Sequence, residues 1–340
     1  MVVPADTVRP APIAPGGDPA LPLAESRRAP ARTTLLGRDF LSLHDFEPHE
    51  VASLVEDGLA WKQGTMPPAQ ARPLQGKSLA LLFLKPSTRT RVAFEVATAA
   101  LGGHPVCLQG GEMQLARGET IGDTGRVLSE LVDAVVIRAF GHRDVEELAA
   151  AASVPVVNAL TDLLHPSQAL ADMITLRERF GRLAGLTVTY VGDGNNVCHS
   201  LCFAAAKTGM RLRVASPEGY GPDAAVLDAA CADAHVTGGR IEVTTDPRAA
   251  VLGADAVYTD TWVSMGFEAG ADARRRSLEP YRVDGDLMRL AAPHAVFMHD
   301  LPAHRGEEVT DEVMDGPASV VFTQAGNRLH AAKAILAAIV

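Results

Sequence analysis

The sequence predicts an α/β protein with two doubly wound parallel-sheet domains joined by interdomain helices. Short apolar runs recur along the chain, and segments with helical spacing of apolar residues separate them. Such alternation is typical of parallel sheets that carry helices on both faces. The 340 residues are also enough for two domains that each bury a core.

The first alternating set is assigned to a domain of residues 34–168. A helix is expected from Pro48, because proline suits the first helical position and apolar residues then repeat along one face. Two further helices are expected, one from Thr120 to about Leu131 and one that begins at Val145. The expected strands are 79–84, 105–108, 134–138 and 154–158.

The second alternating set is assigned to a domain of residues 169–322. A long helix that His165–Gln168 opens is expected to bridge the two domains. A last helix is expected from about Asn327, and residues 323–340 are predicted to pack back on the first domain. The expected strands are 186–191, 211–215, 241–244, 256–259 and 295–298.

Residues 1–33 are expected to form a disordered tail. They hold seven of the 22 prolines, and such a composition cannot bury enough apolar surface to fold. This stretch lacks the basic start and apolar centre of a secretory signal.

Composition excludes several classes of protein. The net charge of −10 argues against a nucleic-acid-binding surface, and the chain contains no apolar run long enough to span a bilayer. The four cysteines suggest neither a disulfide framework nor a zinc cluster, which favours a cytoplasmic location.

The segment Ser87–Arg91 is the strongest candidate for a binding site. It follows the buried strand 79–84, and Ser87 suits the N-cap of a helix that Val92 and Val96 continue. The free N–H groups at a helix start bind anions such as phosphate, and arginine adds bidentate donors. An ordinary basic helix start is the alternative interpretation.

Other polar residues follow the predicted strands. In open parallel sheets, ligands bind beyond the carboxyl ends of the strands, so these residues predict a site between the two domains. Taken singly, Arg138 could be a salt-bridge partner, Asp260 a helix cap and His299 a core imidazole. The residues at these strand ends are 87–91, Arg138, Asn158, 193–196, Asp260 and 299–302.

A dinucleotide site is not indicated. Gly192-Asp193-Gly194 follows a strand, but the third glycine of the fingerprint is absent because position 197 is valine. The next strand ends at Ser216 without an acidic residue to hold a ribose hydroxyl.

Several motifs over residues 38–340 resemble those of the aspartate and ornithine carbamoyltransferases. Ser87–Arg91 resembles the carbamoyl-phosphate signature of that family, and His165–Gln168 resembles its His-Pro-x-Gln motif. The resemblance implies a homotrimer in which a neighbouring subunit contributes Gln114. It implies that carbamoyl phosphate is bound by Ser87, Thr88, Arg89, Thr90, Gln114, Arg138, His165, Gln168 and Arg328.

The segment 260–266 resembles the acceptor loop of the ornithine branch. The implied reaction transfers the carbamoyl group to the side-chain amine of an ornithine-like amino acid, giving a citrulline-like ureido product and phosphate. No metal or organic cofactor is implied. The implied acceptor-binding residues are Asn196, Asp260, Ser264, Met265, Asp300 and Leu301, and the implied catalytic residues are Arg89, Arg138, His165, Gln168 and Asp300.

One residue departs from the family pattern. The ornithine enzymes carry His-Cys-Leu-Pro where this chain has His299-Asp300-Leu301-Pro302. A cysteine thiol with a pKa of about 8.5 is mostly neutral at pH 7, whereas an aspartate carboxyl with a pKa of about 3.9 is ionised. A carboxylate at ~4 Å stabilises an ammonium by about 4 kcal/mol at an effective dielectric constant of ~20, which would deplete the reactive free amine.

Three interpretations of Asp300 stay open. Asp300 acts as the base, or the acceptor is less basic than ornithine, or the acceptor carries an additional cation that pairs with Asp300. We therefore expect an acceptor other than plain L-ornithine. The alternatives are an ordinary anabolic ornithine carbamoyltransferase of arginine biosynthesis and a non-catalytic homologue that binds metabolites.

Overall fold

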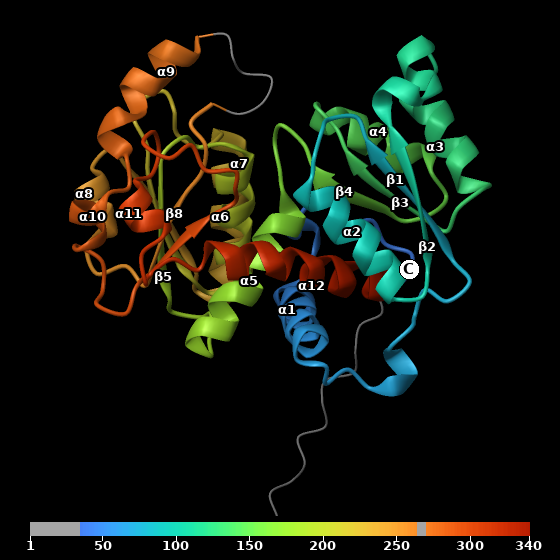
Figure 1. The fold of residues 1–340 in the computed structure, drawn as a ribbon, viewed down its shortest axis with the longest axis horizontal. Coiled ribbons are helices and arrows are strands. Elements are labelled where there is room, and N and C mark those ends of the chain that lie inside the picture. The colour runs from blue at the N-terminus through green and yellow to red at the C-terminus, as the bar shows by residue number, and fades with distance from the viewer. Residues whose placement is uncertain (1–34, 264–269) are drawn as a thin grey trace, which may run out of the picture. The chain divides into compact units, whose positions relative to one another are not determined.

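Two separate parallel sheets organise the computed structural model, which describes residues 35–263 and 270–340 (Figure 1). The first sheet has the strand order β2-β1-β3-β4, and the second has the order β7-β6-β5-β8-β9. This confirms the predicted fold class, whereas the predicted tail lies outside the described residues. The strands are β1 Ser78–Phe83, β2 His104–Gln109, β3 Ala134–Arg138, β4 Val156–Leu160, β5 Thr187–Val191, β6 Arg211–Ala215, β7 Arg240–Thr244, β8 Ala256–Thr259 and β9 Val296–His299.

Helices cover both faces of the first sheet. Along β1, Leu79 and Leu81 enter the large core that α1, α5 and α12 share, while Leu82 faces the apolar cluster that includes Val145 and Leu148 of α4. This alternation follows from the two-residue period of a strand. The helices of this half are η1 Leu43–Asp45, α1 Pro48–Gln63, η2 Pro68–Gln70, α2 Arg89–Ala100, η3 Gly110–Glu112, η4 Gln114–Arg117, α3 Ile121–Ser129 and α4 His142–Ala151.

The second sheet is covered in the same way. Tyr190 and Tyr258 stack at 5.8 Å between ring centroids and belong to the core that includes α6, while Val257 and Phe297 pack in a cluster on the other face. The helices of this half are α6 Asn196–Thr208, α7 Ala224–Thr237, α8 Pro247–Val251, α9 Ala271–Leu278, η5 Glu279–Tyr281, α10 Gly285–Met288 and α11 Asp311–Met314.

Two long helices, α5 Pro166–Phe180 and α12 Val321–Ile339, connect the halves (Figure 1). Helix α12 packs against α5, α1 and α2, and it begins before the predicted Asn327. Helices α1 and α5 approach closely at Gly58, where an added Cβ would lie 2.3 Å from Cδ1 of Ile174. This close approach explains the glycine within α1.

Helix α2 differs from its predicted form in two ways. It begins at Arg89 with Thr88 as N-cap, so the predicted Ser87 cap is wrong. Val92 and Val96 are 52% and 46% exposed, and the buried face carries Phe94 and Ala97 instead. Phe94 and Ala97 are buried because α12 packs against α2, and the two valines lie outside this core.

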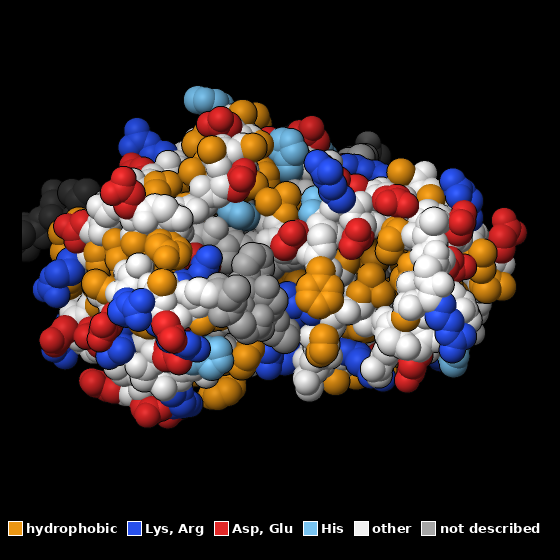
Figure 2. All heavy atoms as spheres, turned by 90° about the horizontal axis from the view of Figure 1, so that it is seen from above, with side chains coloured by type: hydrophobic (Ala, Val, Ile, Leu, Met, Phe, Trp, Pro, Cys, Tyr) orange, Lys and Arg blue, Asp and Glu red, His pale blue; other side chains and the backbone are white. Residues whose placement is uncertain are grey.

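The surface carries charges of both signs. Figure 2 shows acidic and basic side chains interspersed over one face, as the net charge of −10 would suggest. All four cysteines are free. Within the described part of the chain, no helix combines the length and apolarity that crossing a membrane requires.

Candidate functional site

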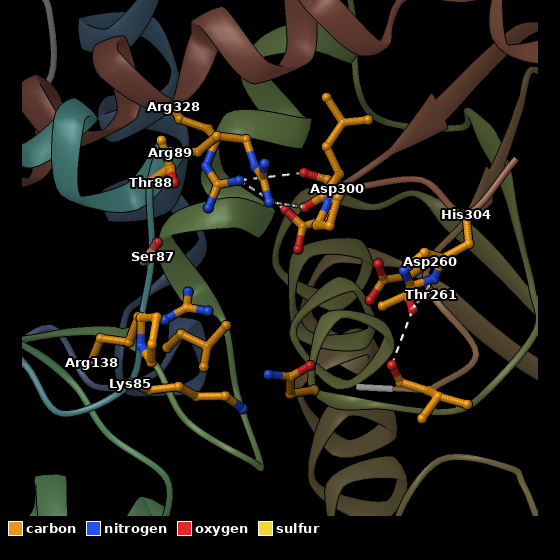
Figure 3. A pocket seen from close by; sticks show the side chains of 16 residues that line it. Lys85, Ser87, Thr88, Arg89, Arg138, Asp260, Thr261, Asp300, His304 and Arg328 are labelled. Atoms are coloured by element: carbon orange, nitrogen blue, oxygen red, sulfur yellow. Dashed lines mark hydrogen bonds and ion pairs between the residues drawn. The ribbon is translucent and has the colours of Figure 1, made fainter. Parts of the chain in front are cut away.

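A pocket of about 380 Å³ lies at the carboxyl ends of both sheets (Figure 3). The strand-end argument therefore predicted its position correctly, because both halves contribute side chains. From the first half the lining includes Lys85, Pro86, Ser87, Thr88, Arg89, Arg138 and Leu160. From the second half and α12 it includes Asn196, Asp260, Thr261, Val263, Asp300, Leu301, Pro302, His304 and Arg328.

Three guanidinium groups gather at one end of this pocket. Arg89 begins α2, Arg138 ends β3, and Arg328 reaches in from α12. The pKa of Arg138 is lowered to about 10, chiefly by burial and also by the charges of Arg328 and Arg89, while the charge of Asp300 opposes the shift. Such a concentration of positive charge is suited to an anion that carries more than one negative charge.

The hydroxyl of Thr90 links two of these guanidinium groups. Arg328 Nη2 donates to Thr90 Oγ1 at 2.7 Å, and Arg138 Nη1 donates to the same oxygen at 3.5 Å. The Nε atoms of Arg89 and Arg138 are buried and have no hydrogen-bond partner within the described residues. Buried donors are normally satisfied, so these two atoms lack partners that the described residues do not supply.

His165 lies at the start of α5 beside the arginines. Its Nε2 is 3.2 Å from Arg328 Nη2, a donor, so this nitrogen acts as an acceptor. Burial and then the neighbouring arginines hold the pKa of His165 well below its usual value, so the imidazole is neutral. The family resemblance implied that His165 donates toward the carbonyl oxygen, and the contact with Arg328 differs from that expectation.

Gln168 follows on the first turn of α5. Its Nε2 donates to Asp172 Oδ1 at 2.8 Å, and Nε2 of Gln324 on α12 donates to the same oxygen at 2.7 Å. The Oε1 atom of Gln168 is buried without a partner in the part of the chain described. The amide therefore has an acceptor free for a ligand.

The opposite end of the pocket is acidic. Asp260 accepts a hydrogen bond from Asn195 Nδ2 at 2.7 Å, and burial, followed by the charge of Asp300, raises its pKa. Asn196 Nδ2 donates to the backbone oxygen of Thr161 at 2.5 Å. A carboxylate and amides in this position suit the α-amino and α-carboxylate groups of an amino acid.

Asp300 and Leu301 lie between the two ends, in the loop after β9. Asp300 Oδ1 is 3.0 Å from Arg328 Nη1, and Leu301 O accepts from Arg89 Nη2 at 2.8 Å. The peptide bond from Leu301 to Pro302 is cis, and Leu301 has a φ of 64°.

A buried imidazole holds this loop. His299 Nδ1 accepts from Leu301 N at 2.8 Å, and its Nε2 lies 3.2 Å from Glu308 Oε1. His299 is thus a buried imidazole with partners for both ring nitrogens, which agrees with the interpretation of His299 as a core residue. It orients the backbone that presents Asp300 and Leu301.

The comparisons with known proteins cover nearly the whole chain. Residues 38–178 match the family model "Aspartate/ornithine carbamoyltransferase, carbamoyl-P binding domain", and residues 184–339 match its "Asp/Orn binding domain". The chain belongs to the aspartate/ornithine carbamoyltransferase family. It is a carbamoyltransferase, which confirms the enzyme class that the motifs predicted.

Similar carbamoyltransferases are named for ornithine. The ornithine carbamoyltransferase of Symbiobacterium thermophilum is 54% identical over 307 residues, which are 90% of this chain and 99% of that protein. The solved ornithine carbamoyltransferase of Pyrococcus furiosus is 52% identical with a TM-score of 0.86, and the match covers 91% of this chain and 98% of that one. The Thermus thermophilus structure is 44% identical with a TM-score of 0.79, over 88% and 97% of the two chains.

Four of the expected site residues that the structure describes do not line this pocket, namely Thr90, Gln114, His165 and Gln168. Thr90 and His165 are buried and contact Arg328, which does line it. Gln114 lies on η4 and lines another pocket with Thr124 and Leu128. Ser264 and Met265 lie outside the described residues.

Two further residues from the polar strand ends have structural partners. Arg91, in the phosphate signature, pairs with Glu95 at 2.7 Å on the surface of α2, so only one of the two arginines in that signature lines the pocket. Asn158 lies in the middle of β4 and not at its end as predicted, and it donates to Leu41 O at 3.0 Å, which gives it a structural role.

Sequence reasoning missed several lining residues of the carbamoyltransferase pocket. Lys85 is 7% exposed, and its Nζ lies 5.2 Å from the ring centroid of Phe140. The strand-end rule could have found it, because Lys85 directly follows the β1 run. His304, whose Nδ1 is 3.1 Å from Thr261 Oγ1, has no local sequence signal.

Proposed function

We propose that this carbamoyltransferase transfers the carbamoyl group of carbamoyl phosphate to the side-chain amine of L-ornithine, giving citrulline and phosphate. The main support is the pocket that joins a three-arginine end to an acidic end with amide groups. Relatives at 51–54% identity carry the name ornithine carbamoyltransferase, and this favours the ordinary acceptor. The expected change of acceptor finds no support among them.

The phosphate half of the site uses the first domain. The phosphate would be bound by Ser87, Thr88, Arg89, Thr90, Arg138 and Arg328. Gln168 would accept from the carbamoyl amine through its unpartnered Oε1, and His165 would lie beside the carbonyl group. Arg89 and Arg138 would stabilise the charge that develops on the carbonyl oxygen in the tetrahedral transition state.

The acceptor half uses the second domain. Asn196 and Asp260, with Ser264 and Met265, would bind the α-carboxylate and α-amino groups of ornithine, and Leu301 O would face the side-chain amine. The amine attacks the carbamoyl carbon, the bond from carbon to the phosphate oxygen breaks, and the nitrogen passes a proton to the departing phosphate. Holding both substrates in one pocket supplies much of the acceleration, up to about 7–11 kcal/mol in favourable cases.

Asp300 would stand where the family's ornithine enzymes have a cysteine. In the described structure its carboxylate is paired with Arg328. A carboxylate that is already paired with a guanidinium group stabilises an approaching ammonium less than a free carboxylate does. Before carbamoyl phosphate binds, the effect of Asp300 on the acceptor's amine is therefore smaller than that of an unpaired carboxylate.

The domain boundaries belong to the same proposal. Residues 34–168 would bind carbamoyl phosphate, residues 169–322 would bind the acceptor, and residues 323–340 would return to the first domain. The packing of α12 against α1 and α2 supports the last assignment. The homotrimer with Gln114 shared between subunits stays a prediction, and light scattering of the purified chain would test it.

Steady-state kinetics with a panel of acceptors test the function. Phosphate release is measured with ornithine, lysine, 2,4-diaminobutyrate, putrescine and aspartate at saturating carbamoyl phosphate. We expect the highest kcat/KM with ornithine. A higher value with another acceptor would restore the changed-acceptor hypothesis, and binding without turnover of any acceptor would support the non-catalytic alternative.

A further inference from the structure

Asp300 connects the phosphate end of the pocket to its acceptor end through a single ion pair. Its Oδ1 lies 3.0 Å from Arg328 Nη1, and the two side chains are only 12% and 7% exposed (Figure 3). The other terminal nitrogen of Arg328, Nη2, donates to Thr90 of α2 at 2.7 Å. Arg328 therefore contacts the phosphate-binding helix with one nitrogen and a carboxylate from the β9 loop with the other.

The position of this carboxylate matters because of the charges around it. Asp300 shares the pocket with Arg89, Arg138 and Arg328, and its charge acts on the guanidinium groups of Arg89 and Arg138. A phosphate dianion that binds these three groups meets the negative charge of Asp300 at the same place. A dianion is the stronger ligand for a cluster of guanidinium groups, because it carries more charge and more acceptor oxygens.

A displaced Asp300 has a second place for its charge. The acceptor-binding residues Asn196 and Asp260 line the same pocket, so an amino acid bound there brings its side-chain ammonium group near the β9 loop. Burial disfavours an isolated carboxylate, so Asp300 needs a new cation when it leaves Arg328. The ammonium group of the acceptor supplies that cation.

We propose that Asp300 is a displaceable internal ligand of Arg328, which the phosphate group of the substrate replaces and which then pairs with the acceptor's side-chain ammonium. The inference rests on the proposed function for the acceptor, while its phosphate step stands on the ion pair alone. In this scheme the binding of phosphate and the binding of the acceptor are thermodynamically coupled, because phosphate releases the carboxylate with which the acceptor pairs.

Calorimetry with inorganic phosphate tests the first step. The parent protein is compared with Asp300→Asn and Asp300→Cys, and with the charge-matched control Asp162→Asn, whose exposed carboxylate does not line this pocket and accepts from the backbone N of His142. We expect both Asp300 variants to bind phosphate at least about tenfold more tightly, and the control to match the parent. Equal or weaker phosphate binding by the folded Asp300 variants would overturn the proposal.

Calorimetry with L-ornithine and L-norvaline tests the second step. Norvaline has the same carbon chain but lacks the side-chain amine, so it cannot use Asp300. With phosphate present, the parent is expected to bind ornithine at least about fivefold more tightly than without it, and the Asp300 variants are expected to lose this gain. Any effect of phosphate on norvaline binding is expected to be the same in the parent and the variants.

The controls separate this proposal from the proposed function. If the parent does not bind ornithine in the presence of phosphate, the assignment of the acceptor fails, and the phosphate titration still decides whether Asp300 is displaced. If ornithine is bound and turned over but its coupling to phosphate survives in Asp300→Asn, the coupling inference is wrong. Thermal unfolding of each variant verifies that the protein titrated is folded.

Discussion

Arg89 connects the two halves of the site through one side chain. Its backbone begins α2, where helix N–H groups face an anion, and its Nη2 donates to Leu301 O in the acceptor half. Burial and the charge of Arg328 lower the pKa of Arg89. Under the proposed function, a residue in this position would serve phosphate binding and the alignment of the two substrates together.

Arg89→Ala is expected to lower kcat/KM by about a hundredfold to a thousandfold, the range found when one transition-state donor is removed. Arg89→Lys keeps the charge but loses the planar fork, and we expect it to recover only part of the loss. Kinetics with carbamoyl phosphate and ornithine measure both variants, with circular dichroism as a control for folding. A mild effect of the alanine variant would mean that the phosphate binds elsewhere.

Asp172 fixes the orientation of the Gln168 amide. Asp172 Oδ1 accepts from Nε2 of both Gln168 and Gln324, so Nε2 of Gln168 faces Asp172 and its Oε1 is left for the carbamoyl amine. In Asp172→Asn the new amide can donate as well as accept, and Gln168 can then turn over.

We expect Asp172→Asn to weaken the preference for carbamoyl phosphate over acetyl phosphate, which lacks the amine, by about tenfold, the worth of one hydrogen bond. The inhibition constant of acetyl phosphate and the KM of carbamoyl phosphate give this ratio. A purely structural role for Asp172 would change both values together and leave their ratio unaltered.

The sequence predicted the residues of the site better than their partners. Arg89, Arg138 and Asp260 follow apolar strands, and that local pattern was enough to assign them to the pocket. The ion pair between Asp300 and Arg328 joins a loop to α12, and neither residue has a local signal for the other. Long-range side-chain pairs depend on how helices pack, which hydrophobic spacing does not specify.

At the scale of secondary-structure elements, the turn from β5 into α6 positions the acceptor residues. Asn195 caps α6 by accepting from Val197 N at 3.0 Å, and the same side chain donates to Asp260. Gly194 directly precedes this cap. A Cβ there would lie 2.3 Å from the backbone carbon of Gly221, so the turn has no space for a side chain.

Gly194→Ala is therefore expected to shift the turn, to lower stability by about 1–3 kcal/mol, and to raise the KM for ornithine. Gly221→Ala is the matched control, because a Cβ at Gly221 would meet no atom within 4 Å in the described structure. Urea unfolding and steady-state kinetics compare the two variants. Similar behaviour of both alanine variants would contradict the packing argument.

Helix α2 illustrates why the element pattern misled the prediction. Its valines suggested a core face, but its other face packs in the core, where Phe94 and Ala97 share a cluster with Ile335 of α12. Apolar spacing alone could not decide between the two faces. The central strands β1 and β3 were predicted accurately because they are buried on both faces and read as continuous apolar runs.

For the whole molecule, buried carboxyl groups set part of the pH dependence of stability. Burial raises the pKa of Asp172 from 3.8 to about 7 in the folded protein. Between about pH 4 and pH 7, Asp172 is therefore protonated in the folded state and ionised in the unfolded state. Stability from this group falls as the pH rises through that range, by at most about 1.4 kcal/mol per pH unit.

Asp172→Asn should remove this contribution. We expect the free energy of unfolding of the variant, relative to that of the parent, to rise by about 1 kcal/mol or more from pH 5 to pH 7. Urea unfolding at several pH values measures the difference, with Asp162→Asn as a surface control that runs parallel to the parent. A constant difference across this range would show that Asp172 does not hold a proton in the folded protein.

The path of α12 has a consequence for synthesis of the protein on the ribosome. Arg328 and Gln324 lie on this helix, yet they contact Thr90 and Asp172, which are made much earlier. Until this helix emerges, the pocket lacks its third guanidinium group and the core lacks Ile335 and Leu336. We therefore expect competence to bind substrate to arise only after residues 321–339 have left the exit tunnel.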